Sequence, residues 1–305
     1  RRFTNHVDQE YTKAKAIETY SHEYAMHFPQ IQWPAGRPAK VSPIYNDLIQ
    51  AGAVMGSYGG WERADWFTND ESLKKPALSY DRQHWFDDVA KECSNVSNSC
   101  GIIDLTGFSR FEINGEGAAK WLETLITGNL PKIGRVGLVY FASPSGKVLT
   151  EMTATRISEN EIWLLTGAGA YWHDRDWLSF NLPQNSTIKI IDTTHDIGTI
   201  LLTGPKSELL IANLTDDKTD VSNFPWLTHK EINLCNEKCR VLKVSYAGEK
   251  GFEIHIANNS MSKVYNELIK FGENYDLVHF GMLALDSMRL EKNYRSWKSD
   301  LTSDY

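Results

Sequence analysis

The sequence has few cysteines, no cluster of basic residues and no long apolar run. The four cysteines form no CxxC pair, and no histidine cluster completes a zinc spacing, so no metal site is expected. Acidic residues outnumber basic ones by 39 to 32, and this net charge of -7 disfavours nucleic acid as a main partner. No apolar stretch approaches the roughly 18 residues of a membrane span, and a signal-peptide pattern is absent, so no membrane partner is expected.

The usual nucleotide-binding and nucleophile motifs are also missing. TGAGA at 166–170 follows a predicted strand, but it lacks both the GxGxxG spacing and the later acid of a dinucleotide fingerprint. We interpret it as a glycine turn between a strand and a helix. There is no GxSxG, and we interpret the adjacent His173 and Asp174 as a solvated helix face rather than a catalytic dyad. Nothing in the chain is expected to bind FAD, NAD or ATP through a recognised loop.

Strand and helix patterns alternate along the chain in an irregular order. Paired strands around a turn are predicted over 101–115 and 136–157, and helices over 85–93 and 260–272. Because no strict βαβ rhythm appears, we predict an α+β fold with mainly antiparallel sheets and flanking helices.

The first sixty residues differ in composition from the rest. A helical segment over 11–22 is followed by WPAGRP, which is a linker by composition. We therefore predict a connector over residues 1–60 and a second unit over 61–305. The chain begins without Met and stops soon after a helical segment, so we expect it to be a piece of a longer polypeptide. Four aromatic residues near the boundary are expected to be exposed: Tyr58, Trp61, Trp66 and Phe67.

The predicted strand KVLTEMTATR at 147–156 carries an acid in its middle, Glu151. Side chains alternate along a strand, so Glu151 shares a face with Thr153, while Met152 belongs to the opposite face. A carboxylate buried without a partner costs several kcal/mol or stays protonated. Glu151 is therefore either a solvated strand residue or an acid placed beside a basic group.

A second acid lies in an apolar strand that follows a glycine turn. SYAGEKGFEIHI at 245–256 places Tyr246 before the turn and Glu253 between Phe252 and Ile254. Taken alone, Glu253 would be a half-exposed hairpin residue. Two carboxylates in apolar strands with aromatic neighbours suit a flat polar ring with several N–H donors. A pterin is such a ligand, because its amino-pyrimidinone edge donates hydrogen bonds that one carboxylate accepts in bidentate fashion.

Four segments in the right order resemble one family. YAGEKGFEIHI resembles the YTGExGxE hairpin of the glycine-cleavage T protein and its relatives, and CGIIDLTGFSRFEINGEGA resembles their opening segment. ALDSMRLEKNYRSWKSDL is similar to a segment of the dimethylglycine and sarcosine dehydrogenases. RPAKVSPIYNDLIQAGAVMGSYGGWERADWF is similar to the connector that precedes the folate domain of those dehydrogenases. The resemblance covers nearly all 305 residues.

The resemblance implies a larger protein, in which an FAD-binding amine oxidase domain precedes the connector and a barrel follows the folate domain. In that family the flavin oxidises an N-methyl amine to an iminium, and tetrahydrofolate takes up the one-carbon unit as 5,10-methylenetetrahydrofolate. Tetrahydrofolate is therefore the cofactor implied for this chain, whereas FAD and the N-methyl amine substrate belong to the missing domain. This chain alone is expected to bind folate and at most to capture formaldehyde or an iminium made elsewhere.

The resemblance also implies roles for four residues. The family's folate-site acid falls on Glu151, and we interpret the glutamate, where most members have aspartate, as the mark of a subtype. Thr153 matches the threonine two residues later, and the tyrosine and glutamate of the hairpin motif fall on Tyr246 and Glu253. Glu151 is then expected to face the folate cavity and to assist proton transfer. Glu253 would hold the pterin edge, with Thr153 and Tyr246 in the same site.

Two other interpretations stay open. The fold could serve as a non-catalytic binding or regulatory module, or the chain could be a T-protein-type aminomethyltransferase. Leu285 stands where the T protein proper has an arginine, which favours the dehydrogenase branch. The expected location is the cytoplasm for a bacterial protein and the mitochondrial matrix otherwise.

Overall fold

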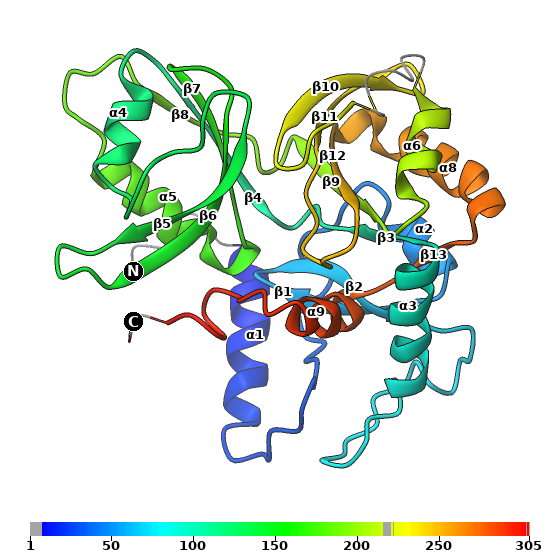
Figure 1. Ribbon diagram of the computed structural model, residues 1–305. Coiled ribbons are helices and arrows are strands. Elements are labelled where there is room, and N and C mark those ends of the chain that lie inside the picture. Colours follow the sequence, from blue (N-terminus) through cyan, green and yellow to red (C-terminus); the bar gives the residue numbers. More distant parts are fainter. Residues whose placement is uncertain (1–7, 216–220, 222, 303, 305) are drawn as a thin grey trace.

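The computed structural model describes residues 8–215, 221, 223–302 and 304. Two lobes, each built from one sheet and its covering helices, lie side by side, and a layer of helices and a hairpin lies beneath them (Figure 1). The two sheets contain six and five strands.

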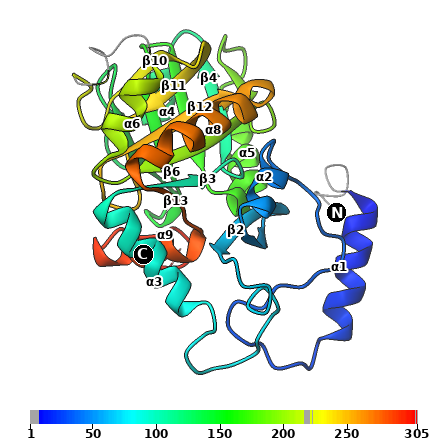
Figure 2. The ribbon, with the colours of Figure 1, turned by 90° about the vertical axis from the view of Figure 1, so that its right-hand side faces the viewer.

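The six-stranded sheet has the order β10-β11-β12-β9-β3-β13. Its strands are β3 (Cys100–Asp104), β9 (Ile197–Thr203), β10 (His229–Leu234), β11 (Glu237–Leu242), β12 (Gly251–Ala257) and β13 (Leu277–His279). All neighbours pair antiparallel except β13, which runs parallel to β3. Helices α6 (Ser207–Leu214) and α8 (Asn258–Gly272) cover one face with leucine, isoleucine and valine side chains (Figure 2).

The five-stranded sheet has the order β5-β6-β7-β4-β8 and is antiparallel throughout. Its strands are β4 (Ser109–Asn114), β5 (Val136–Ala142), β6 (Val148–Arg156), β7 (Glu161–Thr166) and β8 (Lys189–Asp192). Helices α4 (Ala118–Glu123) and α5 (Tyr171–Phe180) pack on one face, where Phe111, Phe141 and Met152 are buried. The predicted α+β fold with mainly antiparallel sheets is thereby confirmed.

The layer beneath the lobes is built around the hairpin of β1 (Ala53–Tyr58) and β2 (Trp61–Phe67). Helices α3 (Phe86–Asn98) and α9 (Met282–Glu291) pack against β2. The remaining elements are α1 (Gln9–Ser21), α2 (Tyr45–Gln50) and the short 3-10 turns η1 (Ala168–Ala170) and η2 (Glu273–Tyr275). Helix α1 buries none of its residues. None of the described helices combines the length and the apolar character that crossing a membrane requires.

The aromatic cluster at the hairpin is only partly exposed, contrary to the expectation from the sequence. Trp61 and Trp66 are only 6% and 3% exposed, whereas Tyr58 is 42% exposed. Trp66 is buried because β2 packs against α9 and β3, and Trp61 stacks against His195. Local composition does not reveal these long-range contacts. Gly59 and Gly169 allow the hairpin tip to approach η1, since a Cβ on Gly59 would lie 2.8 Å from the Ala168 carbonyl oxygen. The TGAGA turn is thus a packing site for the hairpin.

The strands predicted over 101–115 exist, but they do not form a hairpin. β3 belongs to the six-stranded sheet and β4 to the five-stranded sheet, so the chain crosses between the lobes at residues 105–108. A turn between two strands fixes neither pairing nor sheet membership, and here both strands pair with β-strands far along the chain.

A buried glutamate joins three elements of the lower layer. Glu92 of α3 accepts the backbone N–H of Phe67 at 2.7 Å and that of Gly281, at the start of α9, at 2.8 Å. Burial outweighs these two N–H donors and raises the pKa of Glu92 to about 7. Both donors would lose their partner if the side chain were removed.

Replacing Glu92 by glutamine should lower the free energy of unfolding by about 1–3 kcal/mol, because the new NH₂ group faces a backbone N–H. Urea denaturation followed by circular dichroism measures this. The exposed Glu116→Gln is the matched control and should change stability by less than about 0.5 kcal/mol. Equal denaturation midpoints for both variants would contradict a joining role for Glu92.

Candidate functional site

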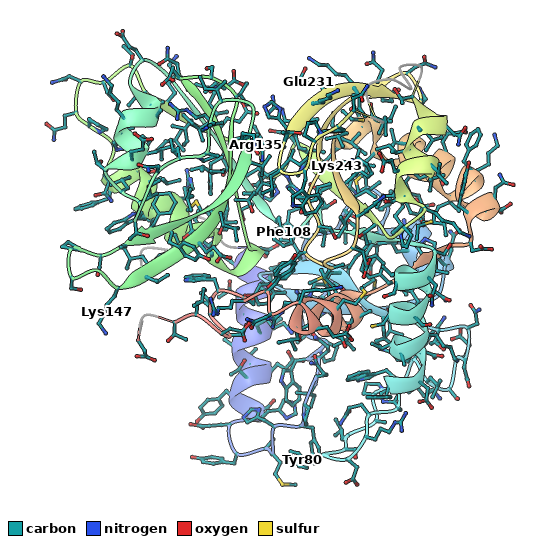
Figure 3. The ribbon with its side chains drawn as sticks, in the orientation of Figure 1. Tyr80, Phe108, Arg135, Lys147, Glu231 and Lys243 are labelled. Atoms are coloured by element: carbon teal, nitrogen blue, oxygen red, sulfur yellow. The ribbon has the colours of Figure 1, made fainter. Side chains whose placement is uncertain are left out.

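The two sheets meet through a small apolar cluster. Val136, Trp163 and Leu165 of the five-stranded sheet pack against Leu242 of the six-stranded sheet. The Trp163 ring lies edge-on to the His255 ring of β12, with 4.6 Å between the centroids. Figure 3 shows Phe108, from the segment that crosses between the sheets, where the two lobes meet. Strand β7 and strand β12 therefore each turn one face toward this junction.

A pocket lies at this junction and is lined from both sheets. Thr153 and Leu165 line it from the five-stranded sheet, Thr199 and Glu253 line it from the six-stranded sheet, and Leu105 and Phe108 line it from the crossing segment. The pocket is small, about 40 Å³, whereas ligand pockets usually measure roughly 300–1,000 Å³. It can accept the polar edge of a ring, and a whole folate would extend beyond it.

Glu151 lies on the same face of β6 as Thr153, two residues away. The opposite face, which carries Thr150 and Met152, is buried under the helices of that lobe. Glu151 pairs with Tyr140 of β5 and accepts a hydrogen bond from its hydroxyl group. Burial raises the pKa of Glu151 above its usual value, and the Tyr140 hydroxyl partly offsets this. Burial raises the pKa of Tyr140 to about 12, and the hydrogen bond to Glu151 adds to this rise.

Tyr246 lies in the turn between β11 and β12 and is held by the C-terminal segment. Its hydroxyl donates to the Arg295 carbonyl oxygen at 2.9 Å, and its ring stacks on Tyr294 with centroids 6.3 Å apart. Burial raises the pKa of Tyr246, and the Glu151 charge contributes to this rise. Tyr246 and Glu151 are thus within electrostatic reach of each other across the junction.

The four residues expected from the sequence therefore lie on the surfaces that the two lobes turn toward each other. Thr153 and Glu253 line one pocket, and Glu151 and Tyr246 are coupled by charge. Among the described residues, a tyrosine hydroxyl rather than a basic group lies beside Glu151. This resolves the alternative left open by the sequence: Glu151 is a half-buried acid with a neutral donor.

A buried arginine fixes the crossing segment. Arg110 of β4 donates to the carbonyl oxygens of Phe108 at 2.7 Å, Thr106 at 3.2 Å and Leu105 at 3.5 Å. Its other contact is the hydroxyl oxygen of Thr199 on β9. The side chain has no exposed surface, and burial lowers the pKa of Arg110 to about 10 despite the nearby Asp104 and Glu253 carboxylates. Arg110 remains a cation at neutral pH.

Thr199 continues this network to a buried histidine. The Thr199 hydroxyl oxygen lies 2.8 Å from Nδ1 of His255, and His255 Nε2 lies 3.6 Å from a carboxylate oxygen of Glu253. Burial lowers the pKa of His255 to about 4, so the ring is neutral at pH 7.

Sequence reasoning missed Arg110, Thr199 and His255. One signal was available, because Glu253 and His255 are two residues apart on a strand and so share a face. The contacts of Arg110 depend on the pairing of β3 with β9, which the sequence pattern does not give.

The interpretation of His173 and Asp174 as a solvated helix face holds for His173, which is exposed, and is wrong for Asp174. Asp174 is fully buried, where it accepts the hydroxyl groups of Thr150 at 3.1 Å and Thr166 at 2.6 Å. His173 Nδ1 lies 2.8 Å from its other carboxylate oxygen. The two threonines come from β6 and the end of β7, so Asp174 fastens α5 to the sheet.

The residues at the junction are acids, hydroxyls and aromatic rings, with a donor set suited to an organic ligand. Within the described residues, no three histidine, cysteine or acidic side chains gather as a metal site. A carboxylate such as Glu253 accepts two N–H groups at once, which fits the edge of a pterin. The Nε2 atom of buried His255 has no hydrogen-bond partner in the part of the chain that the structure describes, and the nearest acceptor is the Glu253 carboxylate that lines the pocket.

Two family models account for the chain. The GCVT N-terminal domain matches residues 44–305, and the FAD dependent oxidoreductase central domain matches residues 1–42. The chain belongs to the GCVT N-terminal domain family.

Similar proteins agree with this assignment. The chain is 28% identical to the mitochondrial dimethylglycine dehydrogenase of Rattus norvegicus, over 99% of this chain and 36% of the relative. It is 26% identical to the mitochondrial sarcosine dehydrogenase of Homo sapiens, over 96% of this chain and 36% of the relative. The chain thus spans about a third of the length of these curated relatives.

A solved structure shows the same fold. The glycine cleavage system aminomethyltransferase T from Bartonella henselae superimposes with a TM-score of 0.72 at 20% identity, covering 87% of this chain and 66% of that protein. The expected T-protein-like fold is confirmed by this similarity.

The buried neutral His255 makes stability depend on pH. Its pKa is about 4 in the folded chain, against roughly 6.5 when unfolded. Between these values the unfolded chain binds more protons, so the free energy of unfolding should fall as pH falls through this window. His279, whose pKa burial also lowers to about 4, acts in the same direction.

The variant His255→Phe should remove the share of this pH dependence that belongs to His255. Urea denaturation between about pH 4 and 7 measures it, with exposed His27→Gln as the control that keeps the wild-type slope. An unchanged slope in His255→Phe would show that His255 does not stay neutral in the folded chain.

Proposed function

We propose that this chain is the tetrahydrofolate-binding, one-carbon-transfer part of a dimethylglycine or sarcosine dehydrogenase-like demethylase. The observation that carries this proposal is the pocket that Thr153 and Glu253 line together from the two lobes. Both positions match the folate-site motifs of the family, although they lie a hundred residues apart in the sequence. The family assignment and the relatives' names support the same conclusion.

Glu253 is proposed to accept the N–H groups of the pterin edge. Its side chain is 17% exposed, which is enough to contact a ligand, and it lies beside buried His255. Leu105, Phe108 and Leu165 give the pocket apolar walls that suit the flat ring. The pocket accepts the edge of the ring, and the remainder of folate extends along the junction toward Glu151 and Tyr246.

Glu151 is proposed to move a proton during transfer. When bound, tetrahydrofolate supplies the two nitrogens that take up the one-carbon unit as 5,10-methylenetetrahydrofolate. With formaldehyde as donor, two C–N bonds form, the C=O bond breaks, and the oxygen leaves as water with the two hydrogens lost from nitrogen. A carboxyl group that holds a proton nearer neutral pH serves this exchange, and burial raises the pKa of Glu151 in that direction.

The remaining parts of the proposal concern the whole protein. FAD and an N-methyl amine would be handled by a flavin domain, and the match of residues 1–42 to a flavoenzyme central domain supports this. The division into a connector over 1–60 and a folate-binding unit over 61–305 belongs to the proposal as well. The relatives named above are mitochondrial proteins, and we propose the mitochondrial matrix or a bacterial cytoplasm for this chain.

A feature of α9 favours the dehydrogenase branch over a T-protein-type aminomethyltransferase. Leu285, at the position of the T protein's arginine, is buried among Trp66, Val89 and Phe280. An arginine there would lose its hydration in an apolar cluster. The site as proposed therefore works without a cation at this position.

The purified chain should bind reduced tetrahydrofolate with a micromolar dissociation constant, a binding free energy of about -8 kcal/mol. Isothermal titration calorimetry measures it. Glu253→Ala should weaken binding at least tenfold, because the pterin N–H groups lose their acceptor. Glu249→Ala is the matched control, since Glu249 lies on the turn just before β12 but pairs with Lys292.

Two results would overturn the proposal. The first is unchanged affinity in Glu253→Ala, which would remove the pterin from this pocket. The second is a folded wild-type chain that binds no tetrahydrofolate, which would favour a non-catalytic module.

Glu151→Gln should slow the capture of formaldehyde by tetrahydrofolate about 10²–10⁴-fold relative to wild type while changing folate affinity less than threefold. The rate above the uncatalysed condensation is followed by absorbance, and no flavin is needed. Tyr140→Phe is the matched variant: it removes the hydroxyl that holds down the pKa of Glu151, so the pH–rate profile should move to higher pH. Glu151→Gln with wild-type rate and affinity would exclude Glu151 from proton transfer.

A further inference from the structure

Four polar side chains lie in a row that ends in the pocket. It runs from Arg110 on β4 through Thr199 on β9 and His255 on β12 to Glu253. Arg110 and His255 are buried, whereas Glu253 is the member that keeps an exposed edge. This row of side chains therefore runs from the protein interior to the pocket.

The chemistry of the groups favours one direction for the hydrogen bonds along this row. Arginine has only N–H donors, so Arg110 must donate to the Thr199 oxygen. The Thr199 hydroxyl hydrogen is then available for Nδ1 of His255, at 2.8 Å. A neutral imidazole that accepts at Nδ1 carries its hydrogen on Nε2. This Nε2–H faces Glu253.

The contact between His255 and Glu253 is open in this structure. The 3.6 Å from Nε2 to the carboxylate oxygen exceeds a hydrogen bond, and Nε2 has no partner among the described residues. A buried donor without a partner costs about as much as a lost hydrogen bond. A shift of the Glu253 side chain by less than an ångström satisfies it.

The same groups disfavour the reverse arrangement. If Nδ1 carried the hydrogen, His255 and Arg110 would both donate to Thr199, and Nε2 would face the carboxylate as an acceptor against an acceptor. A doubly protonated ring would place a second cation near Arg110 and Arg240, both of which act on His255.

We propose that His255 is a positioning residue, set in its Nε2–H form by Arg110 and Thr199, which holds one oxygen of Glu253. The other carboxylate oxygen is thereby presented to the pocket, with its lone pairs in the plane of an incoming ring. The ligand class is a flat ring whose edge carries a ring N–H beside an exocyclic amino group. This inference rests on the proposed function for the name of the ligand, but the tautomer and its contact with Glu253 do not depend on it.

Nitrogen-15 NMR of the histidine rings in the ligand-free chain tests the tautomer. His255 Nδ1 should resonate as an unprotonated nitrogen and Nε2 as a protonated one. Thr199→Ser should keep this pattern, and Thr199→Val should lose it, because valine has no hydroxyl to donate. Glu253→Gln should shift the Nε2 resonance. A protonated Nδ1 in the wild-type chain, or a Nε2 resonance that is unchanged in Glu253→Gln, would overturn the inference.

Calorimetry with two ligands tests the positioning role. Wild type should bind tetrahydrofolate at least tenfold more tightly than its analogue without the 2-amino group, since the unpaired carboxylate oxygen loses a charge-assisted bond. His255→Phe keeps the ring against Trp163 but has no N–H, so this preference should shrink severalfold. His255→Gln, which has an N–H donor, should restore part of it.

The outcomes separate the two proposals. A structural role for His255 predicts that both ligands weaken equally in His255→Phe, and that result would overturn the positioning role. If the wild-type chain binds neither ligand, the proposed function fails, whereas the NMR result still decides whether His255 holds Glu253.

Discussion

The arrangement of the two lobes depends on one buried cation. Arg110 lies where the chain leaves the six-stranded sheet and enters the five-stranded one, and its guanidinium group holds the carbonyl oxygens of the crossing segment. Removing a guanidinium from water costs several kcal/mol, which these acceptors and the nearby carboxylates offset in part. The same side chain also contacts Thr199 on β9. The crossing segment, the edge of the pocket and the orientation of His255 are therefore set together.

The sequence reveals the parts of the site that follow from strand periodicity. Alternation alone places Glu151 with Thr153 on one face of β6, and Glu253 with His255 on one face of β12. What it cannot give is the partner of each strand, because pairing is decided by contacts far apart in the chain. For this reason β3 and β4 look like a hairpin yet enter different sheets, and the buried tryptophans of β2 look like an exposed cluster. The hydrogen bonds of Arg110 cannot be predicted from the sequence for the same reason.

The two acids at the junction have different environments and so suit different tasks. Glu151 has a tyrosine hydroxyl beside it, and burial raises the pKa of Glu151, which suits a group that takes up and releases a proton. Glu253 lies beside the neutral His255, whose Nδ1 faces the Thr199 hydroxyl group. This environment suits a carboxylate that serves as a fixed hydrogen-bond acceptor. Two carboxylates of one type are thus suited by their neighbours to the separate roles proposed above.

Each acid belongs to one lobe, so the distance between them depends on the contacts between the lobes. The opposite face of β6 packs into the core of one lobe, and β12 packs into the core of the other. Between the lobes stand the cluster around Trp163, the crossing segment and the C-terminal residues that contact Tyr246. Arg289 of α9 donates to the Tyr294 carbonyl at 2.8 Å and so anchors that last segment. Packed cores resist deformation. A ligand larger than the present pocket is therefore expected to displace the contacts between the lobes rather than the strands within either sheet.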